Sequence, residues 1–178
     1  MKRSGIQVMA SLVGLVKPLT GYMSLAVLLG LLGHLCATAI TVLGGFAVLY
    51  TLGMEQRLSL LTLFLLIGLC ALLRGMLRYG EQTCNHFIAF KLLALLRDRV
   101  FAVLRRLCPA KLEGKNKGNL ISVITSDIEL LEVFYAHTIS PICIATLYTV
   151  IAAAFLSLYH PILGGITLLA HGTVGIVI

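Results

Sequence analysis

Long apolar blocks, separated by short polar stretches, are the main pattern of this sequence. The uncharged apolar blocks cover residues 22–50, 58–73, 136–158 and 162–178. A helix needs about 20 apolar residues to cross the hydrocarbon core of a bilayer. The second block reaches that length when its helix continues past Arg74 to Tyr79. The pattern predicts membrane-spanning helices over about 22–50, 58–79, 136–158 and 162–178.

A different pattern flanks a polar break at 108–118. Within 79–107 apolar residues recur every three or four positions, and charged residues lie largely off that stripe. Residues 119–135 are amphipathic in the same way. Such spacings are typical of helices with one apolar face. The sequence therefore predicts a helical hairpin over 80–135, with residues 108–118 as its tip.

The expected helix lengths place this hairpin outside the membrane. At about 1.5 Å per residue, a helix over 58–107 is roughly 75 Å long and one over 119–158 roughly 60 Å long. The hydrocarbon core is only about 30 Å thick. Both helices should therefore protrude by about 30–40 Å on the same side.

Composition agrees with lipid as the main solvent. Hydrophobic residues make up 59% of the 178 residues and charged residues 12%, whereas about one quarter of a soluble domain is charged. We therefore expect an all-α membrane protein. The net charge of +7 does not indicate nucleic acid binding, because the basic residues fall between apolar blocks instead of forming one basic face.

The basic residues also predict the topology. Every lysine and arginine except Arg57 lies near the N-terminus or between Arg74 and Lys117. The positive-inside rule then places the N-terminus and the hairpin in the cytoplasm. Residues 1–21 are expected to form a cytoplasmic or interfacial segment. A long cytoplasmic hairpin is suited to carrying motion to membrane helices, although a scaffold without a motor has the same pattern.

Polar side chains within apolar runs are candidate site residues, because each needs a partner in lipid. His34 and His137 are weak candidates for contact with a cargo or with haem iron, and a hydrogen bond between helices is the alternative role. Arg74 and Arg78 could draw an anionic substrate, or they could anchor the topology by pairing with Glu81.

Other residues indicate packing rather than chemistry. Pro141 could kink the third span or merely shape it. The glycines at 30, 33, 44 and 45 permit close helix packing. No two of the five cysteines have the C-x-x-C spacing, and we interpret them as small apolar residues rather than as a metal site or a disulfide framework. No catalytic residue is predicted.

Two segments resemble type-I ABC exporters. Residues 78–101, which include Arg-Tyr-Gly-Glu-Gln and Leu-Leu-Arg-Asp-Arg-Val-Phe, are similar to the second helix of that family. Residues 118–128, Gly-Asn-Leu-Ile-Ser-Val-Ile-Thr-Ser-Asp-Ile, are similar to the start of its third helix. Within the family, the chain looks like the CydC-type subunit of the heterodimeric thiol exporter linked to cytochrome bd assembly. The residues that carry this likeness are Arg78, Tyr79, Glu81, His86, Arg97, 107–110 and 139–141.

The resemblance implies an ABC-exporter transmembrane domain with long cytoplasmic extensions, in a bacterial cytoplasmic (inner) membrane. It implies ATP-driven export of cysteine or glutathione, with haem as a further possible ligand. The implied partners are membrane lipid, a CydD-like half-transporter and its nucleotide-binding domain. Arg74, Arg78 and His86 would lie at the substrate mouth. The residues expected to couple to the ATPase domain, at the hairpin tip, are Lys111, Leu112, Glu113, Lys115 and Lys117.

The sequence departs from that family in one respect. It holds no G-x-x-x-x-G-K-[ST] phosphate loop, and about four spans stand where the family has six. We therefore expect an N-terminal fragment that is not itself an enzyme, with ATP and Mg²⁺ bound in a domain that only intact relatives carry. The alternatives are an inactive truncated half-transporter and a membrane assembly or interaction protein without transport activity.

Overall fold

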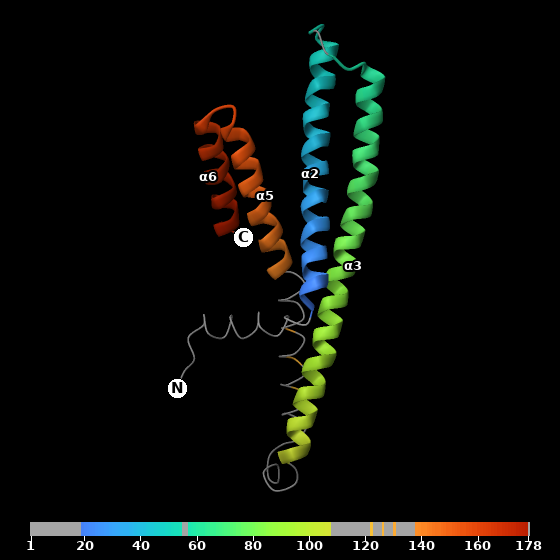
Figure 1. The fold of residues 1–178 in the computed structure, drawn as a ribbon, viewed down its shortest axis with the longest axis vertical. Helices are drawn as coiled ribbons and strands as arrows, with labels where there is room; N and C mark the ends of the chain where they lie inside the picture. Colours follow the sequence, from blue (N-terminus) through green and yellow to red (C-terminus); the bar gives the residue numbers. More distant parts are fainter. Residues whose placement is uncertain are drawn as a thin grey trace. The chain divides into compact units, whose positions relative to one another are not determined.

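The structure is a computed structural model that describes residues 19–54, 57–107 and 138–177, together with Ser122, Ser126 and Leu130. The regular elements of the described part are helical (Figure 1). The long helices are α2 (Thr20–Thr51), α3 (Leu60–Leu107), α5 (Ser140–Ser157) and α6 (Pro161–Val177). The predicted hairpin tip at 108–118 lies outside the described residues.

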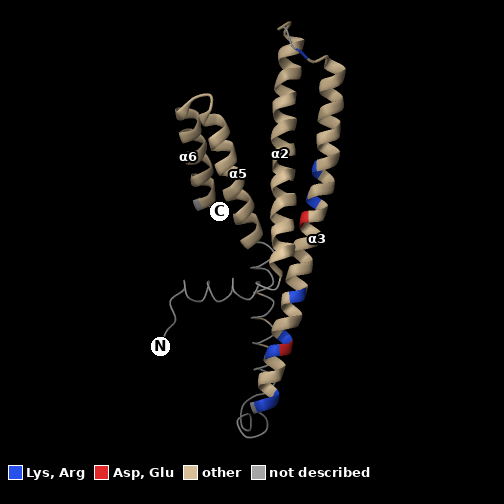
Figure 2. Ribbon diagram, in the orientation of Figure 1, with Lys and Arg blue, Asp and Glu red and all other residues tan. Residues whose placement is uncertain are grey.

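Three described helices, α2, α3 and α5, are long and apolar enough to cross a membrane. The fourth, α6, is apolar but shorter, with 17 residues. Figure 2 shows that α2, α5 and α6 carry no charged residue. The expected fold class, an all-α membrane protein, is therefore confirmed. The side of the membrane that each loop faces stays a prediction.

The helix α3 is continuous over 48 residues, without a break at Gly80. It is about 72 Å long at 1.5 Å per residue, more than twice the thickness of a bilayer core of about 30 Å. Its first charged residue is Arg74, and Figure 2 shows its charges along the part that follows. The prediction of one uninterrupted helix across the apolar and amphipathic stretches is therefore confirmed.

The turn after α2 explains why that helix ends where it does. Gly53 has a φ of 80°, in the left-handed region that favours glycine. Its N–H donates to the carbonyl of Tyr50 at 3.1 Å, and the N–H of Met54 donates to that of Leu49 at 3.2 Å. This pair of bonds is the Schellman arrangement, which satisfies the last carbonyls of a helix. The polar break predicted at 51–57 is therefore a helix stop followed by a short loop.

The starts of the next helices have side-chain caps and prolines. The Oγ of Ser59 accepts the N–H of Thr62 at 3.2 Å before α3, and the Nδ1 of His160 accepts the N–H of Ile162 at 3.3 Å before α6. Pro161 lies in the first turn of α6, where the missing N–H has no intrahelical partner to lose. Pro141 follows two π-helical residues, 138–139, and residues 131–137 lie outside the described part, so its role as a kink or as a shaping residue stays a prediction.

The chain divides into two compact units. The first comprises residues 1–26 and 82–140, and its described core is formed by the start of α2 and the later part of α3. The buried side chains are Leu19, Ile88 and Leu92, with Met23, Leu96 and Ile139 packed against them. The rings of Tyr22 and Phe87 lie 4.5 Å apart on this contact.

The second unit comprises residues 27–81 and 141–178, and its helices approach closely at glycines. In α2 and α3 the close pairs are Leu29 with Gly80 and Gly33 with Leu77, so the two helices are antiparallel. A Cβ at Gly164 of α6 would collide with Ser157 and lie 2.9 Å from the carbonyl oxygen of Ala153, both in α5. The expected close packing thus holds for Gly30 and Gly33, whereas Gly44 and Gly45 have nothing within 4 Å.

Hydroxyl groups in these helices bond back to their own backbone. Each of several threonines and serines donates to a carbonyl three or four residues earlier, at 2.7–3.2 Å. These residues are Thr38, Thr41, Thr51, Thr146, Ser157, Thr167 and Thr173. Such bonds remove the need for water, which lets small polar residues lie in hydrocarbon.

Neighbouring glycines of α6 offer a matched test of helix packing. We expect Gly164→Ala to lower the free energy of unfolding by about 1–3 kcal/mol, because the backbone of α5 cannot move aside for the new methyl group. Gly165→Ala should be neutral or stabilising, because nothing lies within 4 Å and alanine favours helix. Thermal unfolding in detergent, followed by circular dichroism, compares them. Equal stabilities for the two variants would contradict the described contact.

Candidate functional site

A groove of about 280 Å³ lies between α2 and α3 in the second unit. From α2 it is lined by Gly30, Gly33, His34 and Ala37. From α3 it is lined by Arg74, Arg78 and Glu81. The spacings of three and four residues place each set on one face of its helix. Two antiparallel helices therefore bring small residues and an imidazole opposite two guanidinium groups and a carboxylate.

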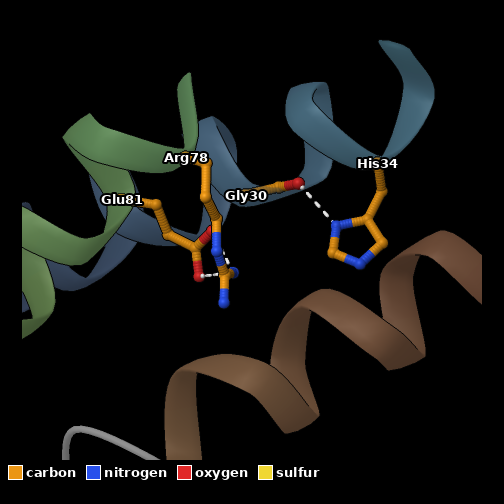
Figure 3. A network of polar contacts seen from close by, with 4 residues as sticks. All are labelled: Gly30, His34, Arg78 and Glu81. Atoms are coloured by element: carbon orange, nitrogen blue, oxygen red, sulfur yellow. Dashed lines mark hydrogen bonds and ion pairs between the residues drawn. The ribbon is translucent and has the colours of Figure 1, made fainter. Parts of the chain in front are cut away.

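The charged centre of the groove is an ion pair between Arg78 and Glu81. The Nη1 of Arg78 donates to Oε1 and Oε2 of Glu81 at 2.9 and 2.7 Å (Figure 3). The side chain of Glu81 is only 2% exposed, whereas that of Arg78 is 56% exposed. The expectation that an arginine pairs with Glu81 is confirmed for Arg78. Because only Nη1 is engaged by Glu81, the N–H groups of Nε and Nη2 remain for another acceptor.

Gly30 makes room for the buried carboxylate. A Cβ at this position would lie 3.1 Å from the carboxyl carbon of Glu81 and would collide with Ile144 of α5. A larger residue in α2 would therefore push both neighbours away. The absence of a side chain at Gly30 lets α3 bring its acidic residue against the backbone of α2.

His34 has a defined tautomer in the structure. Its Nδ1 lies 2.9 Å from the carbonyl oxygen of Gly30 (Figure 3). A carbonyl oxygen only accepts, so Nδ1 is the donor of this bond, and in the corresponding tautomer Nε2 carries the lone pair. The predicted hydrogen bond from His34 to another helix is wrong, since this bond stays within α2. The carbonyl one turn earlier accepts the ring N–H, so this nitrogen needs no hydrogen bond to another helix.

The contact between α2 and α5 beside His34 is made by Tyr148. Its hydroxyl lies 2.7 Å from Oγ1 of Thr38, and its ring centroid lies 5.7 Å from that of His34. The ring centroid of Tyr148 also lies 5.9 Å from that of His171 in α6. The Nδ1 of His171 also bonds a carbonyl of its own helix, that of Thr167, at 2.9 Å. Tyr148 thus supports the imidazole that lines the groove.

The electrostatics of the groove favour an anion. Two guanidinium groups and one carboxylate leave it one net positive charge. Most of the surrounding side chains on α2 and the first part of α3 are apolar, so these charges are less screened than they would be in water. A small ligand with a carboxylate or a similar anionic group fits this environment.

The groove does not fit haem. Of its lining residues, His34 alone could ligate iron, through Nε2. The volume of about 280 Å³ also lies just below the roughly 300–1,000 Å³ of pockets for drug-sized ligands. A molecule of amino-acid or short-peptide size suits it better.

The other predicted site residues lie elsewhere. His86 belongs to the first unit, where its exposed ring stacks on Phe90 with centroids 6.1 Å apart. His137 and the predicted coupling residues Lys111, Leu112, Glu113, Lys115 and Lys117 lie outside the described residues. Among the described cysteines, Cys36, Cys70, Cys84 and Cys143 are free thiols.

Sequence reasoning missed Tyr148, Thr38 and Ala37. The spacing of Gly30, Gly33, His34 and Ala37 is a signal that could have indicated one small polar face on α2. No comparable signal marks Tyr148, because its partners on α2 are 110 or more residues away along the chain and their contact depends on how α5 packs.

Known proteins with similar sequences were found over all or part of the chain. The whole chain is 44% identical to a probable ABC transporter ATP-binding/permease protein of Haemophilus influenzae, of which it spans 32%. Ninety-six residues, 52% of the chain, are 32% identical to the glutathione/L-cysteine transport system ATP-binding/permease protein CydC of Escherichia coli, and cover 17% of it. A stretch of 68 residues, 38% of the chain, is 31% identical to the CydC protein of Haemophilus influenzae, and covers 12% of it.

No family model matches the sequence. The chain is nevertheless homologous over its whole length to an ABC transporter ATP-binding/permease protein, and spans about one third of that relative. Its apolar helices and this homology indicate a multi-pass membrane protein that is similar to ABC transporter permeases.

The ion pair of the groove predicts that substituting Arg78 alone destabilises the chain more than substituting Arg78 and Glu81 together. Arg78→Ala leaves the carboxylate of Glu81 buried and unpaired, which should lower the free energy of unfolding by about 1–3 kcal/mol. Adding Glu81→Gln should restore part of that loss, because a neutral amide is less costly to bury. Denaturant titrations of the two single variants and the double variant in detergent measure the coupling. A double variant less stable than Arg78→Ala would contradict the described burial of Glu81.

Proposed function

We propose that this chain is the membrane-spanning part of an ATP-driven ABC exporter that moves small thiols, cysteine or glutathione, out of the cytoplasm. The observation that carries the proposal is the 44% identity over the whole chain to an ABC transporter ATP-binding/permease protein. The lower similarity to CydC proteins supports the thiol cargo, because those proteins are named for glutathione and cysteine transport.

The groove is the proposed contact with the cargo. Arg74 and Arg78 give it a net positive charge, which attracts the carboxylates of cysteine and glutathione. Its size is suited to such molecules, and His34 adds a hydrogen-bonding nitrogen on the opposite helix. The groove lies just where the charges of α3 begin, which on our topology is the cytoplasmic end of the span.

Helix α3 is the proposed mechanical link. Because it is continuous from the apolar part to Leu107, a displacement at its charged end reaches the groove without passing through a loop. Lys111, Leu112, Glu113, Lys115 and Lys117, just beyond, are the proposed contacts with a nucleotide-binding domain. That domain, on a CydD-like partner half-transporter or on a longer form of this chain, would hold ATP and Mg²⁺.

The proposed location is the cytoplasmic membrane of a bacterium, with the N-terminus inside and the exported thiol supporting cytochrome bd assembly. The second candidate is a membrane assembly or interaction protein without transport activity. The exposed apolar side chains along the described helices favour contact with lipid or with further helices on either account.

Co-purification tests the proposal. We expect the tagged chain, extracted from membranes in detergent, to bring down a protein with a nucleotide-binding domain and vanadate-sensitive ATPase activity. Substituting the three lysines Lys111, Lys115 and Lys117 by alanine should reduce the recovered ATPase several-fold. The matched control is Arg105→Ala with Arg106→Ala, which removes basic residues from the end of α3 instead. Recovery of the chain alone and inert would favour the second candidate.

Reporter fusions test the topology. Green fluorescent protein joined after residue 116 should fluoresce, because that site is expected in the cytoplasm. Alkaline phosphatase joined after residue 159 should be active, since the loop between α5 and α6 is expected on the outer side. The opposite pattern at both sites would invert the proposed orientation and place the groove at the outer end of its span.

A further inference from the structure

The groove offers two kinds of recognition on opposite helices. On α3, Arg78 presents N–H donors, and Glu81 engages only one of its nitrogens. On α2, His34 presents the lone pair of Nε2, because Nδ1 is held by the carbonyl of Gly30. Figure 3 shows the Gly30 carbonyl between the Arg78–Glu81 pair and the imidazole.

We propose that Glu81 is a positioning residue, which sets the guanidinium of Arg78 for a ligand carboxylate, and that His34 determines specificity by accepting the ligand's thiol S–H at Nε2. The inference rests on the proposed function and assigns its cargo groups to atoms. Neither role follows from net charge alone.

The positioning role of Glu81 follows from its burial. Arg78 is a long side chain, 56% exposed, which without a partner would extend toward the headgroup region. Glu81 is fixed by its surroundings, at 2% exposure and against Gly30, so its carboxylate defines where Nη1 lies. Since a guanidinium is planar, fixing Nη1 also orients Nε and Nη2. The groove therefore holds a pre-arranged pair of donors for one carboxylate.

The specificity role of His34 follows from its tautomer. Nε2 accepts a hydrogen bond and, in the neutral ring, does not donate one. A carboxylate could not accept a bond from Nε2, and an ammonium group would be repelled by the two guanidinium groups of the same groove. A neutral donor is the group that fits, and among the groups of the proposed cargo the thiol is one. The contact with Tyr148 holds the ring in place.

Positioning and charge make opposite predictions for Glu81→Gln. The substitution removes the one negative charge among the described residues that line the groove. If net charge alone governed affinity, an anion would bind the variant more tightly. If Glu81 acts by placing Arg78, the anion should bind more weakly despite the added positive charge.

Binding to the full chain in phosphatidylcholine nanodiscs measures this, with radiolabelled glutathione as the probe and glutathione diethyl ester as the competitor that lacks free carboxylates. We expect Glu81→Gln to weaken glutathione binding about tenfold, as for loss of one charge-assisted hydrogen bond. The affinity of the chain for the ester should stay unchanged. Arg78→Lys should behave like Glu81→Gln, and Arg99→Lys, on the same helix but away from the groove, should match the unaltered chain. Tighter glutathione binding by Glu81→Gln, or equal losses for both probes, would overturn the positioning role.

The thiol contact is tested with S-methylglutathione, which lacks the S–H group. The unaltered chain should prefer glutathione several-fold, and His34→Phe should abolish that preference while keeping a ring beside Tyr148. His171→Phe is the matched control, since His171 has the same intrahelical bond and also contacts Tyr148 but does not line the groove. Preserved preference in His34→Phe, or its loss in both variants, would overturn the role of His34.

Failure of this inference and failure of the proposed function are distinguishable. A chain that recovers ATPase activity but binds none of the probes would refute the groove and leave the exporter standing. A chain that binds glutathione through Glu81 and His34 but recovers no ATPase would support the groove and refute the exporter as proposed.

Discussion

A backbone hydrogen bond that is missing inside a bilayer cannot be replaced by water, and this constraint shapes every described element of the chain. It accounts for the long helices of the described part. Where these helices begin or end, the Schellman turn at Gly53 and the side-chain caps at Ser59 and His160 satisfy the terminal backbone groups. The same constraint also explains why several threonine, serine and histidine side chains bond to carbonyls of their own helix. Only once these needs are met locally can glycines such as Gly30 and Gly164 bring two helices together.

The sequence predicted the elements well because their determinants are local. The apolar block and the amphipathic spacing that follows it predicted one helix through 58–107, and α3 spans Leu60–Leu107. The role of Pro141, as a kink or as a shaping residue, stays a prediction, because residues 131–137 before it lie outside the described part. A proline is harmless in a first turn and disruptive further along, so its effect depends on a helix start that apolar patterning leaves undefined.

The site was predictable only in part, for the same reason. The pairing of Arg78 with Glu81 follows from a spacing of three on one helix. The approach of Gly30 to Glu81 and Ile144 depends on the register between helices far apart in sequence, and so does the meeting of Thr38 with Tyr148. Those contacts are tertiary, and a single sequence does not reveal which distant residues meet. The partner of His34 was misjudged because a local carbonyl competes with any distant helix.

The threonine hydroxyls that bond to carbonyls of their own helix affect how easily that helix bends. A carbonyl such as that of His34 takes both the backbone N–H one turn later and the hydroxyl of Thr38, so each bond is weakened by sharing. Helices bend most readily where the ladder is loosened in this way. Thr38 and Thr41 in α2, Thr146 in α5 and Thr167 in α6 therefore mark points of low bending stiffness. At these points a span can curve without losing a turn.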